Sequence, residues 1–290
     1  MDENAGTGCE SPDSGPENQQ ATPRLPSFQA ALLTLVCTLA LLMLLARLNA
    51  LDFLMPRTGQ IPDRFTGALT IELISLGLPL AILFLNGRYS LTASLGLYPA
   101  PVSALAGGVL AGAGLVTVAP QLEAWQARLF PPPPGYMEGL NEILRVTDSG
   151  SFLMALLALA VVPAFFEEAM FRGLLLRAAL RRYGFAVSVL LTGLLFGLFH
   201  LDPHRMTVLA LTGMLISWAA AAGGSLWPAI AMHLTNNALA LILVNRPALE
   251  GQAWVDAAGD VPLAWLIAGA AMVAAGSLLV WVAGRRSGRR

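Results

Sequence analysis

Runs of about twenty apolar residues recur along this chain, and they constrain its fold more than any other feature. A bilayer core of about 30 Å is spanned by an apolar helix of about 20 residues. Windows of this kind lie near 28–48, 66–86, 102–120, 152–176, 185–201, 206–223, 226–244 and 262–283. The sequence therefore predicts an all-α, polytopic transmembrane bundle of about eight spans. Seven spans remain an alternative, because one window is rich in glycine and two are separated only by an uncharged break.

The composition agrees with a membrane protein and excludes other classes. Of the 290 residues, 56% are apolar and 12% are charged, whereas soluble domains have about 45–50% and about 25%. The net charge is −1 and the chain has no lysine, which excludes a nucleic-acid partner held by a basic face. Cys9 lies in a polar tail and Cys37 in an apolar run, so we expect no disulfide between them.

The windows divide the chain into four parts. Residues 1–27 hold five acidic residues among Gly, Pro, Ser and Gln, a composition that predicts a disordered polar tail. Residues 28–150 are expected to form the N-terminal transmembrane helices and a long Pro-rich loop near 121–151. The prolines of this loop favour a polyproline II conformation in water. Residues 151–245 carry the unusual ionisable side chains, and residues 246–290 form the last span and a basic tail.

The arginines predict an orientation and a source. With an even number of spans both termini lie on one side, together with Arg177, Arg181, Arg182 and the C-terminal arginines. The positive-inside rule places that side in the cytoplasm. Because every cationic residue is arginine in a chain rich in Ala and Leu, we expect a bacterial cytoplasmic membrane.

Three short segments place ionisable or polar side chains inside the predicted spans. They are Phe165–Arg172, Phe196–His200 and His233–Asn237. A charge inside a bilayer is unfavourable by several kcal/mol or more, so such residues are functional candidates by default. We therefore expect the three segments to meet in one polar site.

Spacing gives these segments a geometry. Glu168 and Arg172 are four residues apart and can pair on one helix face, while Glu167 is turned by about 100° from Glu168. A carboxylate left unpaired in apolar surroundings is suited to act as a general base on water. His233 and Asn237 are also four residues apart and could donate two hydrogen bonds to one oxygen.

These segments resemble the CPBP family, the membrane proteases related to the type II CAAX prenyl endopeptidase. The pattern EExxxR, FxxxH and HxxxN appears in order, with Glu167, Glu168 and Arg172, then Phe196 and His200, then His233 and Asn237. The resemblance, which covers about 150–245, implies an intramembrane endopeptidase. In it, Glu167 helped by His200 activates water, His233 and Asn237 stabilise the oxyanion, and Glu168, Arg172 and Phe196 shape the site.

The cofactor requirement stays open in the sequence. Glu167, His200 and His233 could supply three zinc ligands and leave an open position. We favour a metal-free mechanism without any cofactor, because Asn237 is a poor zinc ligand but a good oxyanion donor. The chain has no HExxH motif, and no predicted span contains a pair of aspartates.

The expected partners are the lipid bilayer and a membrane-associated or lipidated peptide or protein substrate, whose identity the sequence does not give. Two alternatives remain. One is a non-catalytic membrane scaffold, such as an immunity or secretion partner, and the other is a transporter or channel. Glu72, in the second span, matches no motif, and we interpret it as structural, paired with an arginine or lining a cavity. His204 follows Pro203 and is expected in a loop, because proline cannot continue the helix.

Overall fold

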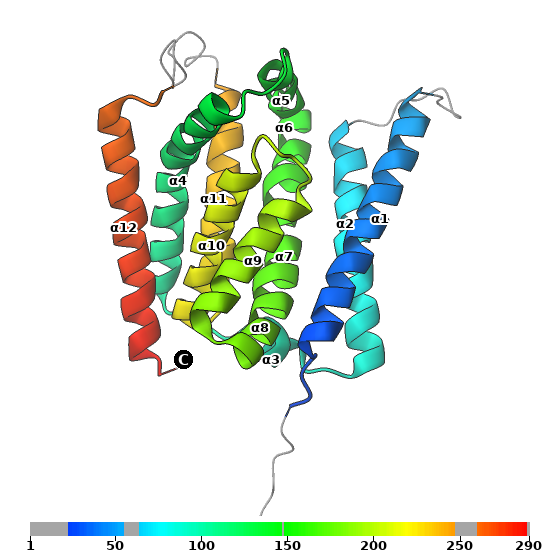
Figure 1. Cartoon of the computed structure of the whole chain (residues 1–290), viewed down its shortest axis with the longest axis vertical. Helices are drawn as coiled ribbons and strands as arrows, with labels where there is room; N and C mark the ends of the chain where they lie inside the picture. The colour runs from blue at the N-terminus through cyan, green and yellow to red at the C-terminus, as the bar shows by residue number, and fades with distance from the viewer. Residues whose placement is uncertain (1–22, 55–63, 147, 247–259, 289–290) are drawn as a thin grey trace, which may run out of the picture.

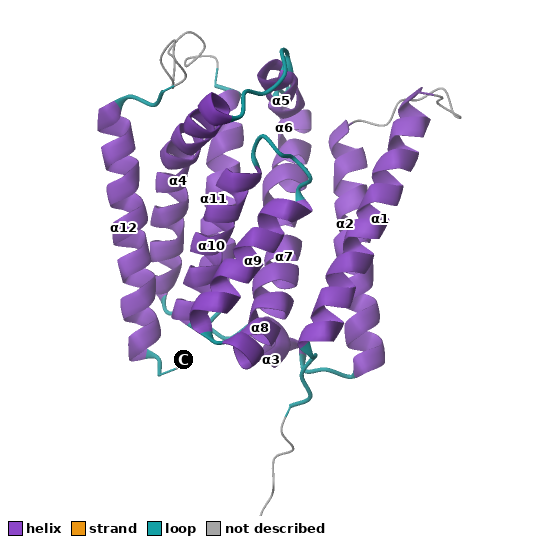
Figure 2. Cartoon of the chain, viewed as in Figure 1, coloured by secondary structure: helices purple, strands orange, loops and turns teal. Residues whose placement is uncertain are grey.

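Long apolar helices make up most of the chain. The computed structural model describes residues 23–54, 64–146, 148–246 and 260–288, and these residues are helical or connecting segments without strands (Figures 1 and 2). Most of the predicted disordered tail, residues 1–22, lies outside the described residues. The separate long helices are α1 (Phe28–Leu54), α2 (Arg64–Gly87), α4 (Val102–Leu129), α9 (Phe185–Phe199), α10 (Met206–Gly223), α11 (Trp227–Val244) and α12 (Leu263–Arg286).

The fourth span is a single rod that changes its helical type twice. Its successive segments are α6 (Ser149–Leu156), η1 (Leu157–Val161), α7 (Val162–Glu168), η2 (Ala169–Leu175) and α8 (Leu176–Tyr183). The two η segments are π-helices, which are rare and occur mostly at functional sites. The predicted span at 152–176 is thus present, but the structure extends it at both ends and adds irregularities that the apolar pattern did not indicate.

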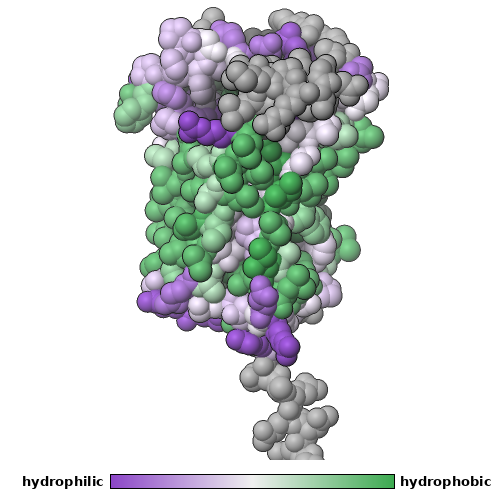
Figure 3. All heavy atoms as spheres, turned by 90° about the vertical axis from the view of Figure 1, so that its right-hand side faces the viewer, coloured by the Kyte–Doolittle hydropathy of each residue, from purple (hydrophilic) through white to green (hydrophobic). Residues whose placement is uncertain are grey.

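The helices identify an integral, multi-pass membrane protein. In the described residues, seven helices are long and apolar enough to cross a bilayer, and α9, with 15 residues, is a shorter apolar helix among them. The prediction of about eight spans is therefore confirmed, with α9 as the short one. Figure 3 shows a broad hydrophobic band between two hydrophilic ends, as expected for a surface that faces lipid.

The predicted long loop at 121–151 is wrong in most of its length. Helix α4 continues to Leu129, and a further helix, α5 (Tyr136–Leu144), follows the four prolines. The apolar window ends near residue 120, but the residues after it are mostly good helix formers, so the helix continues beyond the apolar layer. Helix α5 has no buried residue and lies at one end of the bundle (Figure 1).

Glycine in α4 allows unusually close packing against two other spans. A Cβ added at Gly112 would lie 2.3 Å from the carbonyl oxygen of Met232 in α11. One added at Gly114 would lie 2.4 Å from the carbonyl oxygen of Gly269 in α12. The glycine-rich window is therefore a packed span, and its small residues bring backbones together as is common in membranes. This packing fixes α11, which carries two of the predicted site residues.

Candidate active site

A cavity of about 360 Å³ lies within the bundle and collects the polar residues that the motifs singled out. Glu167 reaches it from α7, His200 from the end of α9, and His233 and Asn237 from α11. Leu159, Leu209 and Ile216 are among its apolar lining. The structure therefore brings the four predicted catalytic side chains, which are far apart in the sequence, to the wall of one cavity.

The neighbours Glu167 and Glu168 occupy different environments. Glu167 is 9% exposed and lines the cavity, whereas Glu168 is fully buried behind it. Both end α7, directly between the two π-helical segments. A π turn shifts the register of the side chains around the helix axis. The predicted separation of the two carboxylates is observed, and Glu167 has the position expected of a residue that meets water and substrate.

Arg172 neutralises Glu168 and holds two spans together. Its Nη1 donates to Glu168 Oε1 at 2.7 Å, so the predicted pairing is confirmed. Its other nitrogens donate to Ser217 Oγ at 3.2 Å and to the Gly213 carbonyl at 3.0 Å, both in α10. The guanidinium also lies over the ring of Phe196, with Cζ 4.3 Å from the ring centroid. A buried arginine with this many partners is a rigid structural element.

His233 is held by the same carboxylate. Its Nδ1 lies 2.8 Å from Glu168 Oε1 and donates a hydrogen bond to this oxygen. The same carboxylate is paired with Arg172. The ring is 6% exposed and lines the cavity with its remaining edge. Arg172, Glu168 and His233 thus form a continuous polar chain, in which the second carboxylate orients the imidazole as carboxylates orient catalytic histidines elsewhere.

His200 is oriented by its own helix. Its Nδ1 lies 2.8 Å from the carbonyl oxygen of Phe196, and because a carbonyl only accepts, Nδ1 carries the proton. Nε2 then keeps a free lone pair. The Phe196 ring packs edge-on against His200 and His233, with centroid distances of 4.7 and 6.1 Å. The ring of Phe196 therefore lies between the two imidazoles and contacts both.

Asn237 is fixed through its amide. Its Nδ2 donates to the carbonyl of Leu159 in η1 at 3.1 Å, and its Oδ1 accepts from Asn236 Nδ2 at 3.1 Å. The amide nitrogen carries two hydrogens, so one remains for a ligand in the cavity. Asn236, which the motif does not include, also lines the cavity. The π-helical carbonyl thus sets the position of the predicted oxyanion donor.

Two charged residues of the cavity lie outside the three motifs. Glu72 of α2 lines the wall, and its Oε2 is buried without a hydrogen-bond partner. Arg205 also lines the cavity, and its Nε donates to Glu123 Oε1 at 2.8 Å. The sequence contained a signal for the position of Glu72 in the cavity, because an acidic residue inside an apolar window is unusual. Nothing in the sequence indicated that Arg205 would line the cavity.

Helix α5 covers one side of the cavity. Leu140 and Leu144 line it from this helix, and the Tyr136 hydroxyl donates to the carboxylate of Asp202 in the α9–α10 connection. Burial and this hydrogen bond raise the pKa of Tyr136 to about 12. His204 packs against the Tyr136 ring at 5.3 Å between centroids and, as predicted, lies in the connection between helices.

A metal site needs three or more ligating side chains arranged around one ion. Among the described residues, no group of three or more His, Cys, Asp or Glu side chains is arranged to hold a metal ion. Glu167, His200 and His233 line the same cavity but do not form such a group. The Nδ1 atoms of His200 and His233 are hydrogen-bonded to Phe196 and Glu168, so Nε2 is the ring nitrogen of each that remains for a ligand.

The fold and the cavity define an integral membrane protein with a polar, carboxylate-containing pocket inside its helical bundle. Residues 149–239 match the family model of the Type II CAAX prenyl endopeptidase Rce1-like proteins. The predicted resemblance is confirmed over this segment, which contains all three motifs, and the family is one of proteases. Neither the curated proteins nor the solved structures give a significant match to the chain.

Proposed function

We propose that this protein is an intramembrane endopeptidase that hydrolyses a peptide bond with water activated by Glu167. The observation that supports this function best is the shared cavity wall of Glu167, His200, His233 and Asn237, which come from three spans. The match of residues 149–239 to a protease family gives the same reaction class. Ionisable residues that line a cavity inside a membrane protein are functional candidates by default.

The proposed reaction begins with a water molecule between Glu167 and the substrate carbonyl. Glu167 accepts a proton as the water oxygen attacks the carbonyl carbon, and His200 orients the water through its free Nε2. The tetrahedral oxyanion accepts hydrogen bonds from Asn237 and from His233, whose ring is oriented by the neighbouring Glu168 carboxylate. Collapse of the intermediate breaks the carbon–nitrogen bond, and the leaving amine takes the proton held by Glu167.

The proposed substrate is a peptide or protein that is itself associated with or anchored in the membrane. The cavity is enclosed by transmembrane helices, and its polar wall is continued by apolar side chains such as Leu159, Leu209 and Leu241. An extended apolar or lipidated segment could therefore pass from the bilayer into this cavity while its apolar groups stay in apolar surroundings. We place the enzyme in a bacterial cytoplasmic membrane.

Exchange of Glu167 tests the proposed base. Glu167→Gln keeps the shape of the side chain and is expected to lower turnover by about 10²-fold or more, the contribution of a general base. The assay uses purified enzyme in proteoliposomes and cleavage of a membrane-proximal peptide, with membrane accumulation measured separately. Glu72→Gln is the matched control, because it removes the other acidic group of the same cavity and is expected to retain measurable turnover. Unchanged turnover in Glu167→Gln would contradict the proposal, and its loss only in Glu72→Gln would transfer the role to Glu72.

A chelator series tests the proposed metal-free mechanism. We expect full activity after extensive treatment with EDTA or phenanthroline, because the described acidic and imidazole groups do not converge as ligands. Activity that is lost and then specifically restored by zinc would overturn this part of the proposal. A partner-binding function that survives replacement of all four cavity residues would instead indicate a non-catalytic scaffold.

A further inference from the structure

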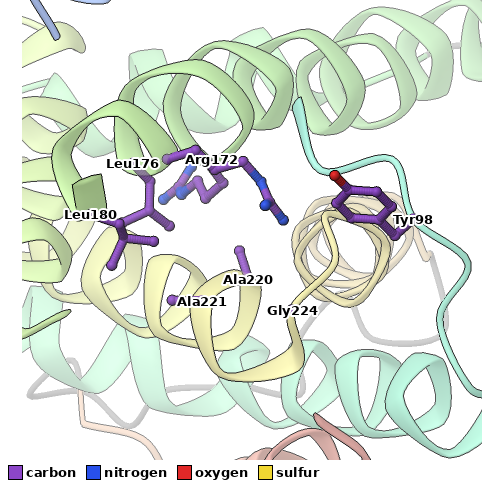
Figure 4. A pocket seen from close by; sticks show the side chains of 8 residues that line it. Tyr98, Arg172, Leu176, Leu180, Ala220, Ala221 and Gly224 are labelled. Atoms are coloured by element: carbon purple, nitrogen blue, oxygen red, sulfur yellow. The ribbon is translucent and has the colours of Figure 1, made fainter. Parts of the chain in front are cut away.

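A second cavity, of about 460 Å³, lies at the end of the bundle opposite to α5. Figure 4 shows Leu176 and Leu180 on one side, Ala220 and Ala221 facing them, and Tyr98 across the cavity. Arg172, Arg177 and Gly224 complete the lining. The cavity therefore combines an apolar wall with two guanidinium groups: that of Arg172, which is paired with Glu168, and that of Arg177. Its lining shares no residue with the cavity that contains Glu167.

Arg177 has no acidic partner in the described part of the chain. The ion pairs there involve other arginines, and the guanidinium of Arg177 contacts instead the ring of Tyr98, with Cζ 5.8 Å from its centroid. Arg177 is half-buried. Burial of a guanidinium without a counter-charge costs free energy, and a bound anion would offset this cost.

The backbone leaves room for this side chain. Gly96 has a φ of +69°, and a Cβ added there would lie 1.9 Å from Arg177 Nη2 and 2.0 Å from Cζ. The surrounding loop is fixed, because the Gly96 carbonyl accepts from Leu226 N–H at 3.0 Å and the Tyr98 carbonyl accepts from Ser225 Oγ at 2.7 Å. The absence of a side chain at Gly96 therefore leaves the space that the guanidinium of Arg177 occupies.

The charge at this end of the molecule is one-sided. Arg177 lies six residues before the end of α8, or about 9 Å along the helix axis, which corresponds to the depth of lipid headgroups. The arginines of the described chain at this end are Arg24, Arg88, Arg177, Arg181, Arg182, Arg285 and Arg286. The described carboxylates belong to the middle of the bundle or to its opposite end. The local field therefore attracts anions.

We propose that this cavity binds the phosphate group of an anionic phospholipid through Arg177. The planar guanidinium matches two phosphate oxygens, which makes arginine the preferred residue for such a contact. Leu176, Leu180, Ala220 and Ala221 cover the first part of the acyl chains. This apolar wall favours a lipid over free phosphate, which would leave the wall without a partner. The argument for this site does not rest on the proposed peptidase activity.

Lipid binding to the purified, delipidated full-length protein tests the site. Native mass spectrometry in detergent measures the affinity for dioleoylphosphatidylglycerol, dioleoylglycerol and inorganic phosphate. We expect phosphatidylglycerol to bind the native protein at least about tenfold more tightly than it binds Arg177→Gln, because charge-assisted hydrogen bonds are lost. Arg182→Gln is the matched control, since it removes the same charge from an exposed residue at the same end, and its affinity is expected to remain native.

The comparison arms decide the chemistry of the ligand. Dioleoylglycerol, which lacks the phosphate, is expected to bind weakly and equally to all variants. Equal affinity of phosphatidylglycerol for the native protein and Arg177→Gln would overturn the proposal, as would equal affinity for the two lipids. Inorganic phosphate that binds as tightly as the phospholipid, and requires Arg177, would overturn the lipid assignment in favour of a soluble phosphate. If Arg177→Gln does not fold, Arg177→Lys decides, with binding expected to weaken several-fold because the bidentate contact is lost.

Discussion

Glu167 and Glu168 are adjacent in sequence, yet one faces a cavity and the other faces an arginine. Glu168 accepts from both Arg172 and His233 through the same oxygen, Oε1. Its other oxygen, Oε2, is buried without a partner. The carboxylate is therefore part of the buried interior, and the orientation of His233 depends on a charge that does not line the cavity.

Removal of one partner from the Arg172–Glu168 pair should be far more harmful than removal of both. Arg172→Met leaves an uncompensated buried carboxylate and is expected to lower the free energy of unfolding by about 3–5 kcal/mol. The double variant Arg172→Met with Glu168→Gln removes both charges and should regain a large part of this loss. Denaturant unfolding in mixed micelles measures both variants. Equal stability of the single and the double variant would contradict the pairing as the dominant interaction.

Helix α5 is the element that connects the cavity to the aqueous end of the bundle. Its residues are not buried, and the described contacts that hold it include the Tyr136–Asp202 hydrogen bond and the Asn245 side chain, which donates to the Leu144 carbonyl at 2.8 Å. Because Leu140 and Leu144 line the cavity, displacement of α5 would open it to water. Such a weakly packed element has the low local stability typical of segments that move.

The pH dependence of this anchor follows from the raised pKa of Tyr136. The folded pKa of about 12 lies above the ordinary value, so the hydrogen bond stabilises α5 fully below pH 10 and is lost as the pH rises towards 12. An ultraviolet titration of the tyrosines should show a step near pH 12 that is absent in Tyr136→Phe. Near neutral pH the amide hydrogens of residues 136–144 should exchange faster in this variant than in the native protein. The reason is the loss of one hydrogen bond, which stabilises the closed position of α5 by about 0.5–1.5 kcal/mol. Identical exchange would show that α5 is held by other contacts.

The sequence predicted those features that depend on local periodicity. The apolar windows located the spans, and the spacing of Glu168 and Arg172 predicted their pairing. The π-helical segments had no local signature, because they depend on how the fourth span packs against its neighbours. The Glu168–His233 contact joins residues 65 positions apart, and no spacing rule reaches that far. Helix α5 lies inside the segment predicted as a Pro-rich loop, and no pattern in the sequence indicated that Leu140 and Leu144 would line the cavity.

The molecule as a whole has two ends of different charge. The start of α1 and the end of α12 lie at the same end (Figure 1), together with the arginines of α8. The first and the last helix of the described chain therefore have their outer ends at the same end of the molecule. The opposite end carries α5 and the connection between α9 and α10, so the proposed orientation places the covered side of the Glu167 cavity away from the cytoplasm.

Topology reporters test the orientation at this scale. By the positive-inside rule, green fluorescent protein fused after the C-terminus should fluoresce in bacterial cells, and alkaline phosphatase fused there should be inactive. Alkaline phosphatase inserted into the segment between α4 and α5 is the matched control and should be active. The reverse pattern would place the termini outside the cytoplasm and would invert the side from which the cavity is entered.

The short helix α9 has a consequence for the surrounding lipid. Its 15 residues extend over only about 22 Å, less than the hydrocarbon thickness of about 30 Å. The acyl chains beside it must compress or give way to water, which is the usual response to hydrophobic mismatch. His200 stands where this thinned patch ends. A polypeptide backbone drawn in from that side would have its amide groups rehydrated sooner than in an undeformed bilayer.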